Sequence, residues 1–187
     1  MTPGFFSNFE KQNSTEKYMA ANLEIKIPLK NFNAIVRHLD ALNARFEATL
    51  HQTDVYFSTP SGLLKLRIEN GSSQLIHYHR NETGKNRKST FYILGLTGDD
   101  PLQYFRRLFP VETIVKKKRL LYLYGDTRIH LDSVQKLGKF LELESRILHG
   151  FPKAKKEFQY VVDGLQLDVS LQFRGSYRDM LMNPGRT

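Results

Sequence analysis

The segment RIHLDSVQKLGKFLELE, residues 128–144, alternates ionisable and apolar side chains in two successive stretches. The ionisable positions are Arg128, His130, Asp132, Glu142 and Glu144, and the residues that alternate with them within each stretch are Ile or Leu. Successive side chains of a β-strand point to opposite faces, so each stretch would carry its charges on one face. Because a turn signal near Gly138 separates the stretches, the segment predicts two neighbouring strands, 127–133 and 139–146.

The same alternation recurs along much of the chain. It occurs in ANLEIK (21–26), at Glu24 and Lys26, and in LLKLRIE (63–69), at Lys65, Arg67 and Glu69. It also occurs in QLIHYHR (74–80), at His77 and His79 or Tyr78 and Arg80, and in VKKKR (115–119), at Lys117 and Arg119. Asn70-Gly71 is a strong hairpin signal between the second and third of these stretches. With further strands expected at 53–57, 89–94 and 112–123, the chain contains about eight strands.

Three helices are expected between these strands. Apolar residues recur at helical spacing between Asn31 and Phe46. Asp100-Pro101 is a helix start that ends before Pro110, and a helix after Pro152 ends near Gly164. A short final element covers SYRDMLM (176–182). This content predicts an α+β fold, in which an eight-stranded antiparallel sheet is curled or closed into a barrel or tunnel with helices packed outside it.

Size and composition limit the type of protein. We expect a flexible tail over residues 1–20 and a single domain over 21–187. The tail lacks the apolar core of a signal peptide, no other stretch is apolar enough to span a membrane, and there is no cysteine, so we expect a soluble, cytoplasmic protein. The net charge of +9 indicates an anionic partner.

The ionisable strand faces have two interpretations. A one-sided sheet exposes its polar face to water, and this is the ordinary explanation for any single strand. Such faces usually carry many Ser, Thr and Gln, whereas these positions are nearly all Lys, Arg, Glu, Asp or His. A sheet that curls with this face inward would instead form a charged cavity, in which ions must be paired or bind ligands. Lys117 and Arg119 would then point inward, and His130 would be a wall residue.

The mixed signs of these charges favour one class of ligand. The clustered carboxylates Glu24, Asp132, Glu142 and Glu144 are hard oxygen ligands suited to Mg²⁺ or Mn²⁺. Clustered Lys and Arg neutralise phosphate oxygens. A cavity with both suits a metal-bound polyphosphate, whereas acids among the bases argue against nucleic acid. Gly-rich phosphate loops and the common hydrolase motifs are absent from the sequence.

The stretch NLEIK, residues 22–26, resembles the E-x-E-x-K signature of the CYTH superfamily, the triphosphate tunnel metalloenzymes. The resemblance continues through QTDVYF, LLKLRIENG, LIHYHR, the long stretch from VKKKR to FLELE, and SYRDML, over roughly residues 21–182, and is greatest for the branch labelled class IV adenylyl cyclase-like. It implies an antiparallel barrel or tunnel with phosphate-binding bases and metal-binding acids. By position, the signature residues are Glu24 and Lys26, the metal-binding acids are Glu24, Asp132, Glu142 and Glu144, and the phosphate-binding bases are Lys65, Arg67, Arg80, Lys117, Arg119 and Arg128.

One signature position departs from the family pattern, since Asn22 replaces the first glutamate and removes a negative charge. The leading hypothesis is a Mg²⁺- or Mn²⁺-dependent phosphohydrolase acting on tripolyphosphate, ATP or thiamine triphosphate. In it Glu24, Glu142 and Glu144 hold metal, and Lys26 orients or deprotonates the nucleophile if burial lowers its pKa. The alternatives are an adenylyl cyclase that converts ATP to cyclic AMP and pyrophosphate, and a binding module without catalysis.

Overall fold

The computed structural model describes residues 22–80 and 89–185, and the predicted tail over residues 1–20 lies outside them. Its eight strands are β1 (Asn22–Leu29), β2 (Arg45–Phe57), β3 (Leu63–Glu69), β4 (Ser72–Arg80), β5 (Ser89–Leu96), β6 (Val111–Tyr124), β7 (Thr127–Val134) and β8 (Gly138–Arg146). They form one antiparallel sheet in the order β1-β8-β7-β6-β2-β3-β4-β5. The predicted α+β fold with an eight-stranded antiparallel sheet is therefore confirmed.

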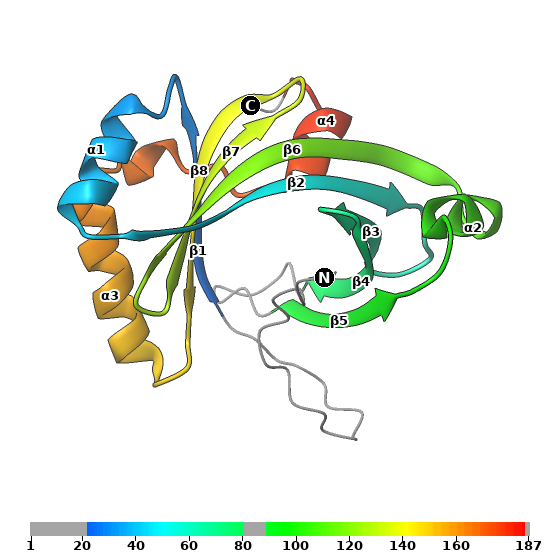
Figure 1. Cartoon of the computed structure of the whole chain (residues 1–187), viewed down its shortest axis with the longest axis horizontal. Coiled ribbons are helices and arrows are strands. Elements are labelled where there is room, and N and C mark those ends of the chain that lie inside the picture. Colours follow the sequence, from blue (N-terminus) through cyan, green and yellow to red (C-terminus); the bar gives the residue numbers. More distant parts are fainter. Residues whose placement is uncertain (1–21, 81–88, 186–187) are drawn as a thin grey trace, which may run out of the picture.

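The long strands β2 and β6 hold the sheet together. They pair along almost their whole length, with β7, β8 and β1 continuing the sheet from β6 and β3, β4 and β5 continuing it from β2. Figure 1 shows this ribbon crossing the molecule while the strands on either side curl away from it. In the described part of the chain β1 and β5 remain at opposite edges, so the sheet is tunnel-like but not closed into a barrel.

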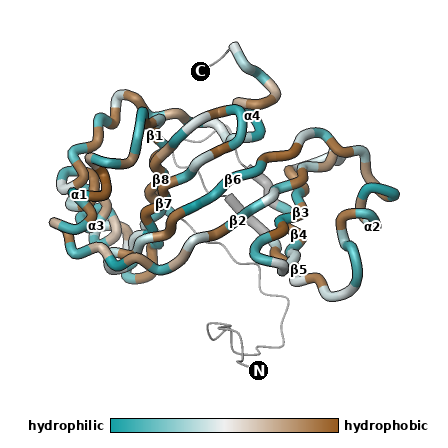
Figure 2. Tube along the Cα trace, turned by 45° about the horizontal axis from the view of Figure 1, so that its top comes forward, coloured by the Kyte–Doolittle hydropathy of each residue, from teal (hydrophilic) through white to brown (hydrophobic). Residues whose placement is uncertain are grey.

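Three helices cover the outer face of the sheet. They are α1 (Asn33–Ala41), α2 (Pro101–Leu108) and α3 (Phe151–Gly164). α1 and α3 pack over β1, β7 and β8 on a core that includes Leu39, Leu131 and Val161. α2 lies at the other end of the molecule from α1 and α3 (Figure 2). It packs over β2 and β3 through Phe105 against Phe57. The outer face is thus apolar at both ends, where helices bury it.

A fourth helix, α4 (Tyr177–Met182), packs on the inner face instead. Ser176 and Asp179 form a reciprocal capping box that starts it. Its buried side chains, Tyr177 and Met180, contact inward-facing residues such as Val115 and Phe140. The short final element expected from the sequence is therefore a helix, but it lies inside the curl and not outside it.

Two helix boundaries differ from the sequence prediction. The helix expected up to Phe46 ends at Ala41, because Asn43 adopts a positive φ of 55° and the chain turns directly into β2. Arg45 and Phe46 are therefore strand residues. Gly164 is the last helical residue of α3 and not its cap, and a Cβ there would lie 2.5 Å from Leu42, so glycine permits close packing of α3 on α1.

Other local predictions are confirmed. Asp100 caps α2 by accepting a hydrogen bond from the backbone N–H of Gln103 at 3.0 Å, and Pro101 is its first residue. Asn70 and Gly71 both have positive φ, as a two-residue hairpin turn requires.

None of the helices within residues 22–80 and 89–185 is both long and apolar enough to cross a membrane.

Candidate functional site

The inner face of the sheet, opposite α1, α2 and α3, gathers the ionisable side chains. Strand register places them on one face, because Lys26 pairs with Glu142, Glu24 with Glu144, Arg119 with Asp132, and Asp54 with Arg67. The described members are Glu24, Lys26, Asp54, Lys65, Arg67, Glu69, Lys117, Arg119, Arg128, Asp132, Glu142 and Glu144. We call this set the inner-face charge cluster.

Asp54 of β2 is the centre of one half of the cluster. It is almost completely buried, and Arg67 Nε and Nη2 donate to its two carboxylate oxygens at 2.7 and 2.9 Å. Lys65 Nζ donates to the same carboxylate at 3.1 Å, and Lys117 Nζ lies 4.0 Å from it. Burial alone raises the pKa of Asp54, but the neighbouring Lys65 and Arg67 hold it well below its usual range. Three cations thus share one ionised carboxylate.

Arg119 of β6 is the centre of the other half. Its Nε and Nη2 donate to both oxygens of Asp132 at 2.7 and 2.6 Å, and Nη2 also donates to Glu142 at 2.7 Å. Burial lowers the pKa of Arg119, but the two carboxylates reverse that effect and raise it above its usual value. Arg119 in turn lowers the pKa of Asp132, and Lys26 and Arg119 lower that of Glu142, against the effect of burial.

Two lysines lie where cations outnumber nearby acids. Burial, reinforced by the charge of Arg119, lowers the pKa of Lys117 to about 7. Burial beside Arg67 lowers the pKa of Lys65 to about 8. Burial is the main cause of both shifts, and an anion placed between the two lysines would oppose it by favouring their protonated forms.

Tyr177 of α4 connects the two halves. Its hydroxyl donates to Asp132 Oδ2 at 2.9 Å, and its ring packs edge-on against Phe140 at 5.1 Å. The ammonium groups of Lys26 and Lys117 lie 4.4 and 5.3 Å from its ring centre, within the range of cation–π attraction. Because Lys26 Nζ also donates to the carbonyl of Gly175 at 3.2 Å, the C-terminal segment fixes the position of this lysine.

The carboxylates of β1 and β8 form the third part of the cluster. Glu24 and Glu144 are directly opposite on paired strands, and Glu142 lies one inward position along β8. The Asn22 amide donates to Glu144 Oε1 at 3.0 Å, and Arg128 approaches the other oxygen at 3.4 Å. Within the described residues, no three acidic or histidine side chains come together as a ready metal site. Asp132 and Glu142 are instead engaged by Arg119.

His130 is buried in the wall of this face, as expected from the sequence. It lies between Glu142 and Leu121 in register, and burial together with the charge of Arg119 lowers its pKa to about 3. It is therefore neutral at pH 7, and its Nδ1 has no hydrogen-bond partner among the described residues.

All but one of the site residues predicted from the sequence therefore share this face. The exception is Arg80, whose side chain lies outside the described part of the chain, although its backbone pairs with Ser89 in β4 and β5. The prediction missed Asp54 and Tyr177. Asp54 could have been found, because Gln52, Asp54 and Tyr56 alternate with Thr53, Val55 and Phe57 in the same way as the other strands. Nothing in the local sequence around Tyr177 indicates that α4 enters the curl.

Comparison with known proteins gives consistent matches. The model of the CYTH domain matches residues 20–147. A protein of Methanocaldococcus jannaschii named "Putative adenylate cyclase" is 26% identical over 170 residues, which cover 84% of this chain and 97% of that relative. A protein of Pyrococcus horikoshii with a solved structure is 28% identical and superposes with a TM-score of 0.73, over 86% of this chain and 98% of its own.

A solved protein from Hippeastrum has the same fold at 14% identity. It is described as a "Putative adenylyl cyclase" with a dominant triphosphatase activity, and the match covers 89% of this chain and 96% of that one with a TM-score of 0.65. The family match alone spans more than half of the present chain. The chain therefore belongs to the CYTH domain family.

Proposed function

We propose that this protein is a divalent-metal-dependent phosphohydrolase that binds a triphosphate on the inner face and cleaves it. The observation that carries the proposal is the concentration of Lys65, Arg67, Lys117 and Arg119 around two buried carboxylates, Asp54 and Asp132. Their side chains converge from β3 and β6, and a phosphate chain supplies the negative charge that the two lysines lack.

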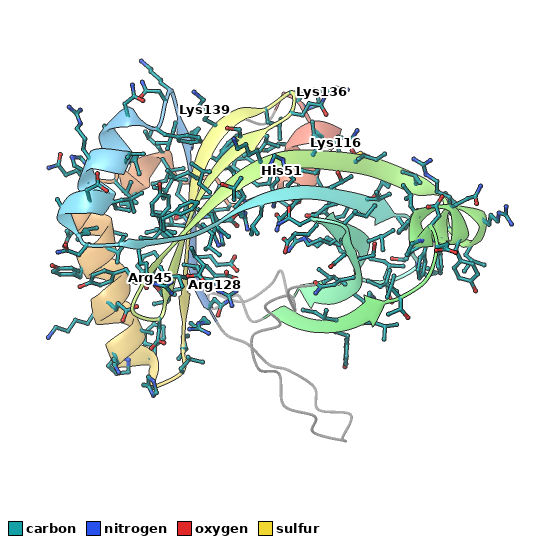
Figure 3. All side chains as sticks on the ribbon, in the orientation of Figure 1. Arg45, His51, Lys116, Arg128, Lys136 and Lys139 are labelled. Atoms are coloured by element: carbon teal, nitrogen blue, oxygen red, sulfur yellow. The ribbon has the colours of Figure 1, made fainter. Side chains whose placement is uncertain are left out.

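The bases have distinct tasks in this proposal. Asp54 and Asp132 hold Arg67 and Arg119 in fixed orientations, so that their remaining N–H groups meet phosphate oxygens without reorganisation. Lys65 and Lys117 act as point charges between them. Arg128, at the more exposed end of β7, would contact one end of the chain (Figure 3), and we also assign Arg80 to phosphate binding on its position in β4.

The acids fit Mg²⁺ or Mn²⁺ with two protein ligands. Mg²⁺ is commonly bound through one or two carboxylates together with substrate phosphates and water, so a preformed group of three protein ligands is not required. Glu24 and Glu144 would hold the ion, with Glu142 beside them. Asp132 is assigned to positioning Arg119, because both of its oxygens already accept hydrogen bonds.

Catalysis would depend on where these groups hold the substrate. A bound divalent ion would supply Lewis-acid polarisation of the phosphate and a more acidic water. Arg119 and Lys117 would stabilise the charge that develops on the phosphate oxygens. Lys26, fixed by the Gly175 carbonyl and the Tyr177 ring, would orient the attacking water near Glu142.

An adenylyl cyclase is the second candidate, and the name of the M. jannaschii relative favours it. Both reactions would use the same bases and differ in which phosphorus faces the nucleophile. Incubating the protein with tripolyphosphate, ATP and thiamine triphosphate, each with Mg²⁺ or Mn²⁺, and following products by phosphorus NMR separates them. Orthophosphate release supports the hydrolase, cyclic AMP with pyrophosphate supports the cyclase, and binding without turnover overturns both.

Replacing Asn22 with Glu is expected to lower the Mn²⁺ concentration needed for half-maximal turnover by about tenfold. The Asn22 amide now donates to Glu144, and a carboxylate in its place adds a negative oxygen ligand beside Glu24 and Glu144. In metal-free protein the same change lowers the melting temperature, because it replaces a hydrogen bond with like-charge repulsion. Asn33→Glu, at an exposed position at the start of α1, adds equal charge away from the site and serves as control. An unchanged metal requirement in Asn22→Glu would contradict the metal assignment.

Affinity for tripolyphosphate is expected to fall as pH rises above about 7. Lys117 has a pKa of about 7 and Lys65 one of about 8, and each attracts phosphate only when protonated. Lys117→Arg keeps its charge, so in that variant the fall should move to about pH 8. Calorimetric titration of wild type and Lys117→Arg with tripolyphosphate, without metal, from pH 6 to 9 measures this pH dependence of the affinity.

The pH dependence of the free energy of unfolding provides a second check on Lys117, and its sign is opposite to that of the affinity. The pKa of Lys117 is about 7 in the folded protein against 10.5 for an ordinary lysine, so the unfolded chain binds more protons between these values. Stability contributed by this group therefore rises with pH across that window.

A tripolyphosphate affinity that is equal at pH 6 and 9 would contradict the affinity prediction, because it would show that neither Lys65 nor Lys117 contacts the ligand.

A further inference from the structure

A groove lies on the outer face of the β2–β6 ribbon, opposite the inner-face charge cluster. It has a volume of about 630 Å³, within the range of ligand-binding cavities, and the residues that line it include His51, Thr53, Asn70, Lys116, Lys118 and Ser133. Strand alternation places His51, Lys116 and Lys118 outward, because Gln52 and Lys117 point inward. Gln52, Lys117 and Val134 also line the groove, although their side chains alternate to the inner face. The outward-pointing side chains of the groove therefore lie on the opposite side of the sheet from the inner-face charge cluster.

The fold leaves this part of the outer face uncovered. The β3–β4 turn at Asn70-Gly71 lies beside His51, where the Asn70 side chain accepts from the backbone N–H of His51 at 3.1 Å. The β7–β8 turn lies beside Lys116, whose carbonyl accepts from Gln135 N–H at 2.9 Å. Residues of both turns, Asn70, Gly71 and Gln135, therefore line the groove beside the ribbon. The apolar cores under α1 and α3 and under α2 lie on either side of it.

The charge of the groove has one sign. Of the described residues that line it none is acidic, and neither Lys116 nor Lys118 forms an ion pair with another described residue. Lys118 is directly opposite both His51 and Ser133 in the paired strands. Lys136, at the β7–β8 turn, lies on the same side of the molecule as His51 and Lys116 (Figure 3). The inner-face charge cluster, by contrast, sets six carboxylates among six cations and does not account for the net charge of +9.

We propose that this groove binds a linear inorganic polyphosphate chain. Lysine ammonium groups, hydroxyls and amides suit phosphate oxygens, and the groove offers each of them. No Phe, Tyr or Trp is among the described lining residues, so the groove lacks the stacking surfaces that single-stranded nucleic acids use. Among its described lining residues, Ile68 and Val134 are the only large apolar ones, too few for the apolar anchors of a bound peptide. The proposal goes beyond the inner-face activity and does not depend on it.

The test compares binding of fluorescently labelled long-chain polyphosphate to three forms of the full chain over a range of salt concentrations. Lys116→Gln/Lys118→Gln removes the groove charge. Lys153→Gln/Lys155→Gln removes the same charge from the exposed side of α3. Arg67→Gln alters the inner face alone. The groove variant should bind at least about tenfold more weakly, since a lysine near an anionic surface contributes roughly 1 kcal/mol. The slope of the logarithm of its binding constant against the logarithm of the salt concentration should be smaller by about 1.4, since each phosphate contact to a single strand contributes roughly 0.7.

Each other result has a defined meaning. Equal binding by the groove variant and the α3 variant overturns the proposal, as does wild-type protein that binds no long-chain polyphosphate. Preference for a single-stranded RNA or an acidic peptide of matched charge overturns the choice of ligand. Weaker binding by Arg67→Gln alone assigns the chain to the inner face. Because the readout is binding and not turnover, failure of the proposed hydrolase leaves the result unaffected.

Discussion

Replacing Arg119 with Lys should reduce kcat/KM for a triphosphate substrate by about a hundredfold, the scale at which one fixed charge-stabilising donor is lost. Arg119 donates at once to Asp132 and Glu142, and its planar fork holds these contacts while presenting further N–H groups to the inner face. Lysine keeps the positive charge but cannot reproduce two-point contact. Initial rates of phosphate release for wild type and Arg119→Lys, at saturating and limiting substrate, measure the effect.

A matched control separates this effect from general damage. Arg178 of α4 also forms an ion pair with a carboxylate, and its Nε donates to Glu112 at 2.6 Å. This pair is not part of the inner-face charge cluster. Arg178→Lys should therefore retain most of its kcat/KM. If Arg119→Lys kept full kcat/KM while remaining folded, Arg119 could not be a substrate-binding group.

Replacing Asp54 with Asn should reduce the free energy of unfolding by about 3–5 kcal/mol, the cost typical of breaking a buried ion pair from one side. Asp54 is the shared partner of Lys65, Arg67 and Lys117. Its loss leaves three buried cations to repel one another. Urea unfolding monitored by circular dichroism at pH 7 gives the value.

The pH dependence of stability should change with it. Because the pKa of Asp54 is held well below its usual value in the folded state, its stabilising contribution is present above pH 4 and is lost as pH falls below that value. In Asp54→Asn the free energy of unfolding should therefore fall less steeply as the pH decreases below 4. Asp126→Asn, which disturbs a more exposed pair with Arg146, should cost under about 1 kcal/mol. Equal costs for the two variants would mean that Asp54 does not hold the bases together.

The strand faces could be predicted from the sequence because alternation is a local property. A period of two along RIHLDSV and GKFLELE is enough to put His130, Asp132, Glu142 and Glu144 on one face. The abundance of charge on that face indicated correctly that it curls inward. Helix starts at Asp100-Pro101 and the Asn70-Gly71 turn were equally local, and both appear in the structure.

The partners of each charge could not be predicted in this way. Whether Asp132 serves a metal or an arginine depends on the β6–β7 register, which sets it opposite Arg119. The role of Asp54 likewise depends on the register between β2 and β3, which sets it opposite Arg67. The position of α4 depends on a C-terminal segment returning to the inner face, where Tyr177 meets Lys26 and Lys117. The two arginine–carboxylate pairs thus depend on strand register, and the Tyr177 contacts join residues far apart in sequence.

The central claim, that the inner face uses metal at β1 and β8 to hydrolyse a triphosphate, is tested most directly with Glu144. Glu144 is directly opposite Glu24 and accepts from Asn22, so Glu144→Gln removes one metal-binding charge with little change in shape. Phosphorus NMR should follow orthophosphate release from tripolyphosphate by wild type and Glu144→Gln as Mn²⁺ is titrated. The account predicts that wild type shows metal-dependent turnover and that the folded variant loses it. Full metal-dependent turnover by Glu144→Gln would contradict the assignment of this site.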